Sequence, residues 1–148
     1  MVFRSGVYPL VMIPLEITHK AVVTPNILNN LTQSSSPFSQ LIHELLSFFS
    51  DTYEKVFGFK DGPPLHDPCA IAYVIDSDLF TLRQMKAEVV CGDGPCSGQT
   101  VCDIWGYKGH DNEGNLLVAM TWKDLNQFWK LMEQAYSQAD QVSPLNKG

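Results

Sequence analysis

The sequence has 148 residues, of which 45% are hydrophobic and 11% aromatic, so it fits one domain with a substantial core and argues against intrinsic disorder. Its formal net charge is −6, and its ten lysines and arginines are scattered, which disfavours a nucleic-acid-binding face. No run approaches the ~20 apolar residues that cross a bilayer. Pro9 and Pro14 interrupt the apolar run near the start, so we expect a buried strand there rather than a signal peptide.

The four cysteines bear on the cellular compartment. With no secretory signal in the sequence, free thiols in the reducing cytoplasm are expected. Cys91, Cys96 and Cys102 are separated by four and five residues, whereas structural zinc sites prefer tighter pairs with a second His or Cys pair nearby. We therefore expect a cytoplasmic protein without a zinc site.

The first 60 residues predict a strand and two helices. The β-branched run Leu10–Ile17 predicts a buried strand. Thr24-Pro25 combines a capping residue with a first-turn proline and predicts a short helix, and Ser36-Pro37 repeats the signal for a longer one. Apolar residues at helical spacing continue this second helix to about Phe57, and Gly58 ends it.

The remaining residues predict a helix, three strands and a last helix. Asp67-Pro68 again has the form of a helix start, for a helix that ends at Ile75. Strands are expected over Thr81–Cys91, Thr100–Tyr107 and Leu116–Met120, with a glycine-rich loop at 92–98 and a tight turn at 111–115. Thr121 and Asp124 resemble a capping box for an amphipathic helix that ends near Ala139. The pattern predicts an α/β domain over residues 1–139 and a polar tail over 140–148.

His66 and Asp67 are the residues with the clearest chemical potential. They lie where a loop meets a helix N-terminus, at which oriented N–H groups and the positive end of the helix dipole gather. The helix N-terminus favours a neutral imidazole. The plainer interpretation gives Asp67 an N-cap role and makes His66 a surface or packing residue.

A resemblance adds to this interpretation. The segment 61–73 (Asp-Gly-Pro-Pro-Leu-His-Asp-Pro-Cys-Ala-Ile-Ala-Tyr), with Asp76 and Asp78-Leu79-Phe80 after it, resembles the C-terminal signature of the inosine–uridine nucleoside hydrolases. Residues 7–25 resemble the central strand of that family, 98–103 resemble its next glycine-led strand, and Phe128-Trp129 suits its terminal helix. The resemblance implies the C-terminal portion of a Rossmann-like, mostly parallel sheet with flanking helices.

The resemblance also implies a chemistry. In that family, an N-ribosidic bond is hydrolysed through an oxocarbenium-like transition state, much as in glycoside hydrolysis. A calcium ion binds the ribose hydroxyls and the attacking water. On this sequence Asp67 would be a calcium ligand, and His66 would face the leaving base as proton donor or positioner. Tyr53, and less directly Phe57 or Tyr73, could line the base, with core packing as the alternative role.

The sequence departs from the family in one respect. The aspartate-rich loop D-x-D-x-G-x-D-D, which supplies further calcium ligands and the general base, is absent from the 148 residues. Calcium takes about six to eight oxygen ligands, which Asp67 alone cannot supply. We therefore expect the isolated chain to be inactive on ribonucleosides, and an exposed sheet edge to favour homo-oligomers. The alternatives are a non-catalytic interaction or structural module, which could pair with a complete subunit, and an unrelated α/β domain.

Overall fold

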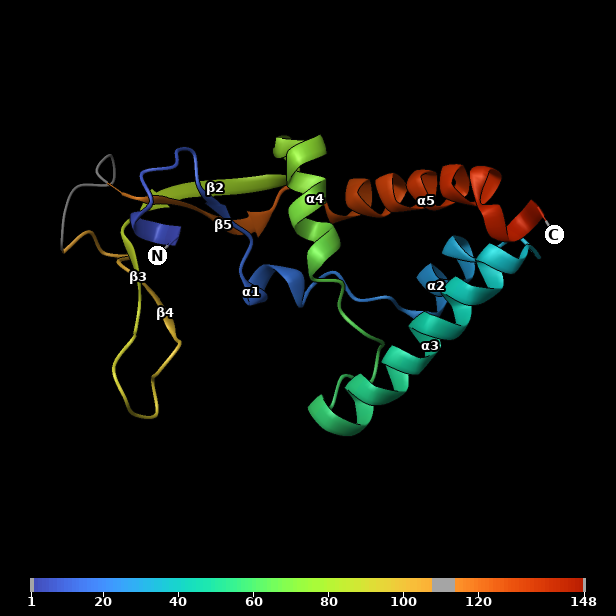
Figure 1. Ribbon diagram of the computed structural model, residues 1–148, viewed down its shortest axis with the longest axis horizontal. Coiled ribbons are helices and arrows are strands. Elements are labelled where there is room, and N and C mark those ends of the chain that lie inside the picture. The colour runs from blue at the N-terminus through green and yellow to red at the C-terminus, as the bar shows by residue number, and fades with distance from the viewer. Residues whose placement is uncertain (1, 108–113, 148) are drawn as a thin grey trace.

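The structure is a computed structural model that describes residues 2–107 and 114–147 (Figure 1). Its α-helices are α1 (Leu15–Thr18), α2 (Pro25–Leu31), α3 (Pro37–Phe57), α4 (Asp67–Ile75) and α5 (Leu125–Val142). Its strands are β1 (Val11–Met12), β2 (Phe80–Met85), β3 (Ala87–Val89), β4 (Thr100–Cys102) and β5 (Leu116–Trp122). Short 3₁₀ turns occur at Val2–Arg4, Ser77–Leu79 and Pro144–Lys147.

The strands form two sheets. The larger sheet has the order β1-β5-β2, in which β5 pairs in parallel with β1 and antiparallel with β2. The antiparallel pair β3 and β4 forms a separate hairpin that projects from the body of the molecule (Figure 1). The predicted α/β class with flanking helices is confirmed, and the sheet within this chain is mixed.

The main core lies where α1, α4 and α5 meet the sheet. Its fully buried side chains include Ile17 from α1, Phe80 from β2 and Phe128 from α5. Trp122 packs on both aromatic rings, at 4.3 Å from Phe80 and 5.1 Å from Phe128 between ring centroids. Its indole Nε1–H donates to the Ile17 carbonyl at 2.9 Å, so this core fixes α1 against the end of β5.

The helix starts expected at Thr24 and Ser36 are confirmed. Each side-chain oxygen accepts a backbone N–H three residues ahead, from Ile27 and Ser39 respectively. Gly58 ends α3 with a φ of 75°, the left-handed conformation that glycine adopts without a steric penalty. These signals are local, which is why the sequence shows them directly.

The strand expected over Leu10–Ile17 is wrong in length. Only Val11–Met12 is a strand, and α1 follows at once over Leu15–Thr18. Pro14 has no N–H to give to a sheet, and its carbonyl instead accepts from Ile17 N (3.0 Å) and from the next residue (3.1 Å). The proline therefore turns the chain from strand into helix.

Two further strands are shorter than expected. The segment Thr81–Cys91 divides into β2 and β3 at Lys86, whose carbonyl accepts from Asp103 N at 2.8 Å. The segment Thr100–Tyr107 is a strand only to Cys102, after which tight turns follow. The strand β5 instead continues to Trp122, two residues beyond the expected end.

The C-terminal helix begins later and ends later than expected. Asp124, rather than Thr121, is its N-cap, and the Asp124 carboxylate accepts from Gln127 N at 2.9 Å. Thr121 still belongs to β5, where it pairs with Thr81. The helix passes Ala139 and ends at Val142, so part of the segment named as a polar tail is helical. The domain limits 1–139 stay a prediction.

The last described residues pack on the start of α3. The Ser36 hydroxyl donates to the Asp140 carboxylate, and Asn146 Nδ2 donates to the same carboxylate at 2.8 Å. The backbone N–H of Phe38 donates to Asn146 Oδ1 at 3.1 Å. In the predicted turn at 111–115, residues 111–113 lie outside the described residues. None of the helices in the described ranges has the length and hydrophobicity to cross a bilayer.

Candidate active site

The loop before α4 is held against the segment that follows α1. Val23 N donates to the Pro63 carbonyl, and Leu65 N donates to the Ala21 carbonyl, both at 2.9 Å. Gly62 has a φ of 128°, and a Cβ at this position would collide with the Val23 carbonyl oxygen. The close backbone approach thus requires glycine, and it fixes where the next residues of the loop lie.

His66 follows this loop and occupies the N-cap position of α4. Its Nδ1 lies 2.8 Å from the hydroxyl oxygen of Thr18 in α1, and its Nε2 lies 3.0 Å from the hydroxyl oxygen of Tyr53 in α3. Thr18 is buried, whereas His66 and Tyr53 are half-buried. Both ring nitrogens therefore have hydrogen-bond partners from elements far apart in the sequence.

An aromatic group surrounds the imidazole. The His19 ring meets it edge-on at 5.4 Å between centroids, and the Tyr53 ring lies at 6.2 Å. Phe59 contacts both neighbours, at 5.1 Å from His19 and 5.8 Å from Tyr53, and Phe57 lies 5.2 Å from Tyr53. We call His66 with Thr18, His19, Tyr53 and Phe59 the His66 corner.

The His66 corner favours the neutral imidazole. Burial lowers the pKa of His66 below its ordinary value because the charged ring loses solvation, and the nearby His19 lowers it further. The carboxylate of Asp67 acts in the opposite direction. The lowered pKa has the direction that the sequence predicts, but its principal cause is burial.

Asp67 lies beside His66 in a different environment. It is the first residue of α4 and not its N-cap, so the expected capping role is wrong. Its side chain is exposed and accepts no hydrogen bond from the residues that the structure describes. The preceding loop places His66, not Asp67, at the cap position. The Asp67 side chain is thus open to solvent.

The described residues do not by themselves fit a calcium ion. Nowhere in ranges 2–107 and 114–147 do three His, Cys, Asp or Glu side chains lie together as a metal-binding group. Calcium takes about six to eight oxygen ligands, and Asp67 offers one exposed carboxylate. Within these two ranges, the side chains therefore do not form a calcium site.

Comparison with known proteins identifies the family of the chain. The sequence model of the inosine-uridine preferring nucleoside hydrolases matches residues 1–130. The chain belongs to this family. The relationship agrees with the resemblance of residues 61–73, and it covers most of the chain.

Two relatives and one solved structure show the extent of the relationship. An uncharacterized protein of Schizosaccharomyces pombe is 38% identical over 127 residues, which are 86% of this chain and 38% of that protein. A pyrimidine-specific ribonucleoside hydrolase of Escherichia coli is 36% identical over 134 residues, 90% of this chain and 41% of the enzyme. The purine-preferring ribonucleoside hydrolase of Gardnerella vaginalis superposes with a TM-score of 0.81 at 25% identity, over 96% of this chain and 43% of the enzyme. The chain thus spans about two fifths of the length of these three proteins.

Within this nucleoside hydrolase segment, the structure brings together only some of the residues considered from the sequence. Tyr53 reaches His66, and Phe57 lies behind Tyr53. Tyr73 instead packs toward the core, 6.3 Å from the Phe80 ring. Thr18, which sequence reasoning missed, lies 48 positions before its partner His66.

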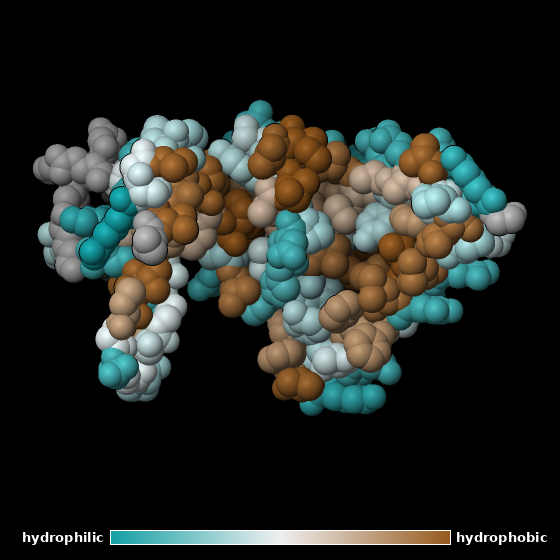
Figure 2. Space-filling view, viewed as in Figure 1, coloured by the Kyte–Doolittle hydropathy of each residue, from teal (hydrophilic) through white to brown (hydrophobic). Residues whose placement is uncertain are grey.

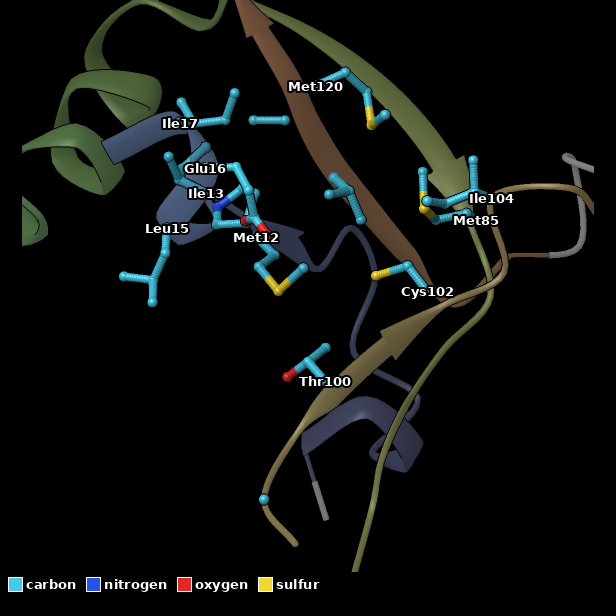
Figure 3. A pocket seen from close by; sticks show the side chains of 14 residues that line it. Met12, Ile13, Leu15, Glu16, Ile17, Met85, Thr100, Cys102, Ile104 and Met120 are labelled. Carbon is cyan, nitrogen blue, oxygen red and sulfur yellow. The ribbon is translucent and has the colours of Figure 1, made fainter. Parts of the chain in front are cut away.

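A large cavity of the nucleoside hydrolase segment lies away from the His66 corner. It is an open hollow of about 680 Å³ between α1 with β1 on one side and the β3–β4 hairpin with β5 on the other (Figure 3). We call it the sheet hollow, and it is lined by Met12, Ile13, Pro14, Leu15, Glu16, Ile17, Met85, Gly98, Thr100, Cys102, Ile104, Val118, Ala119 and Met120. Among the described residues that line it, only Glu16 is charged, and most of the others are apolar. The lining is therefore better suited to packing against an apolar group than to catalysis.

Proposed function

We propose that this chain provides the leaving-group side of a ribonucleoside hydrolase active site. The reaction would cleave the N-glycosidic bond of a ribonucleoside with water, to give ribose and the free base. The observation that carries the proposal is the His66 corner, in which a half-buried imidazole is held at both nitrogens beside aromatic rings. Family membership and the named activities of the relatives support it.

The proposed roles follow from the contacts. When the bond between the ribose carbon and the base nitrogen breaks, the base carries developing negative charge and needs a proton. His66 Nε2, on the Tyr53 side of the ring, is the group we assign to donate or position that proton. Tyr53 and Phe59 would present ring faces and edges to a flat base, a contact suited to any nucleobase.

The proposal covers ribonucleosides as a class. The relatives include an enzyme named as pyrimidine-specific and one named as purine-preferring. Inosine and uridine therefore serve as the two test substrates. The cytoplasmic location and the homo-oligomer expected from the sequence stay predictions.

Asp67 has a separate proposed role. Its exposed carboxylate at the start of α4 would be one ligand of a calcium ion whose other ligands come from outside these 148 residues. A calcium ion bound there would hold ribose hydroxyls and water. In this proposal, the chain contributes one calcium ligand, the carboxylate of Asp67 beside His66.

A non-catalytic interaction module is the second candidate. The sheet hollow favours it, because an open apolar surface of this kind commonly marks a site where protein packs on protein. In this case the chain would associate with another polypeptide without hydrolysing nucleosides.

Ribose release from inosine and uridine, with calcium added, tests the proposal. We expect no appreciable hydrolysis by the 148-residue chain alone, and hydrolysis by a form that also carries the aspartate-rich loop. Glu88→Ala, on the exposed surface of the hairpin, is the matched control and should leave the rate unchanged. Ribose release by the chain alone that disappears in Asp67→Ala would contradict the expected inactivity. A loop-carrying form that folds, binds calcium and hydrolyses neither nucleoside would favour the interaction module.

A further inference from the structure

We propose that Thr18 is a positioning residue that accepts a hydrogen bond from His66 Nδ1–H and so fixes Nε2 as the ring nitrogen with the free electron pair. The inference deepens the proposed function and rests on it for its significance, because Nε2 is the atom assigned to the leaving base. With the neutral ring protonated on Nδ1, Nε2 would position the Tyr53 hydroxyl that donates to it, and it would itself donate a proton to the base only after the ring has taken one up. Thr18 itself lies on the far side of the ring from Tyr53 and would not touch a substrate.

The first argument is the chemistry of the two hydroxyl groups. A neutral imidazole carries one N–H and one unprotonated nitrogen, so it accepts one hydrogen bond and donates one. Two hydroxyls contact it, from Thr18 at 2.8 Å and from Tyr53 at 3.0 Å. The phenol, with an ordinary pKa of about 10, is a much stronger acid than an aliphatic alcohol, and it is therefore the better donor. The pairing in which Tyr53 donates to Nε2 and Thr18 accepts from Nδ1 follows.

The second argument is the other contact of Thr18. Its hydroxyl also lies 3.4 Å from the Leu15 carbonyl oxygen, three residues earlier in α1. A carbonyl oxygen can only accept, so the single hydroxyl proton of Thr18 has an acceptor there. The oxygen then keeps its electron pairs for the imidazole N–H. Both arguments give the same direction to the hydrogen bond.

The burial of Thr18 and the fixed position of α1 hold the hydrogen bond from His66 Nδ1–H to the Thr18 hydroxyl in this direction. Its side chain is 3% exposed, which leaves little room for water to replace either partner. The helix α1 that carries it is fixed through the bond from Trp122 Nε1 to the Ile17 carbonyl at 2.9 Å. The hydroxyl is therefore held in place while the ring adjusts to it. Tyr53, on a longer and half-buried side chain, is the partner that can move.

The test is the ¹⁵N spectrum of the imidazole ring. The full 148-residue chain is labelled with ¹⁵N-histidine and studied by magic-angle-spinning NMR, which reads tautomers in associated and in dispersed material alike. Spectra are recorded at about pH 8.5, where a histidine ring is neutral. The His66 signals are assigned by their loss in His66→Gln. We expect wild-type His66 to carry its proton on Nδ1.

Three variants then distinguish the effect of the Thr18 hydroxyl on the His66 tautomer from the effect of the Tyr53 hydroxyl. Thr18→Val should shift the tautomer ratio toward Nε2–H by about tenfold, the effect of losing one part-buried hydrogen bond. Thr18→Ser should restore the wild-type spectrum, and Tyr53→Phe should keep the proton on Nδ1. Thr32→Val removes a comparable hydroxyl, which bonds to Leu28 O at 2.8 Å in α2, and should leave His66 unchanged.

Several outcomes would overturn the inference. They are a wild-type proton on Nε2, a Thr18→Val spectrum identical to wild type, or a loss of the Nδ1 tautomer in Tyr53→Phe. The wild-type spectrum decides the direction of the bond even if Thr18→Val does not fold. No nucleoside enters the experiment, so its result is independent of whether the hydrolase proposal holds.

Discussion

The His66 corner and the sheet hollow differ in how far this chain alone completes them. In the corner, a half-buried ring finds hydrogen-bond partners from α1 and α3, so its polar atoms are satisfied. In the hollow, apolar side chains line an open space, and Leu15 is 60% exposed. The polar atoms of the ring are thus satisfied within the described residues, whereas the apolar lining of the hollow is open to solvent. Local hydrogen bonds can form in a part of a fold, but a sheet face needs the layer that covers it.

The exposed apolar surface is not confined to the hollow. Figure 2 shows hydrophobic residues gathered on the outer side of α4 and the hairpin standing apart from the body. Ile71, Val74 and Ile75 are the large exposed apolar residues of that helix. The comparison between corner and hollow leads to four predictions.

The largest expected effect concerns His66 and Asp67 in a form that carries the aspartate-rich loop. Asp67→Ala should abolish ribose release more completely than His66→Ala, because loss of a ligand to a hard cation disturbs metal, water and ribose together. Loss of His66 should cost about 10²- to 10⁴-fold, the usual contribution of general acid catalysis. Steady-state rates on inosine and uridine measure the difference. Equal residual rates in the two variants, on both substrates, would contradict the assigned roles.

Gly62→Ala should break the corner by moving the loop that carries His66. The new Cβ would collide with the Val23 carbonyl oxygen at a φ of 128°, so we expect a loss of at least about 3 kcal/mol in the free energy of unfolding. Gly58→Ala is the control. It also has a positive φ, of 75°, but nothing lies within 4 Å of its Cβ, so about 1–2 kcal/mol is expected. Similar urea midpoints for the two variants would show that the close approach at Gly62 does not hold the loop.

The sheet hollow should make the isolated chain bind a hydrophobic dye and self-associate. Adding charge to its lining, with Leu15→Lys and Met120→Lys together, should lower dye fluorescence by roughly half and reduce association in size-exclusion chromatography. Val74→Lys, on α4 outside the hollow, should have a smaller effect. A monodisperse wild-type monomer that binds no dye and unfolds cooperatively would show a self-sufficient domain, and the interaction module would then become the better proposal.

The smallest expected effect is on the pH dependence of stability. The unfolded His66 ring takes up a proton near its ordinary pKa of about 6.5, whereas burial and His19 lower the pKa in the folded chain. Between those two values only the unfolded chain binds the proton, so stability falls as the pH falls through this window. The contribution is fully present above about pH 6.5. Urea midpoints from pH 8 to pH 5 should therefore decline less in His66→Gln than in wild type, and parallel declines would contradict the assignment.

The sequence predicts best those features that depend on neighbouring residues. The caps at Thr24 and Ser36 act within three positions, so composition alone indicates them. The α/β class also follows from the order of the patterns. The boundary errors arise from tertiary pairing, as at Thr121, which stays in β5 because Thr81 lies opposite it.

The candidate site is only partly visible in the sequence for the same reason. His66 and Asp67 are found through their short motif, although their roles stay predictions. Thr18 carries no such signal, because its contact with His66 exists only once α1 is fixed against the sheet. The sheet hollow depends on how the hairpin and α1 are placed, which periodicity does not report.

The helix α1 belongs to both regions at once. The side chain of Leu15 lines the sheet hollow, while its carbonyl contacts the Thr18 hydroxyl one turn later. The helix has only four residues, so the apolar lining and the polar contact lie within a single turn of chain. The same short helix thus supplies a wall of the sheet hollow and the hydroxyl that contacts His66 Nδ1.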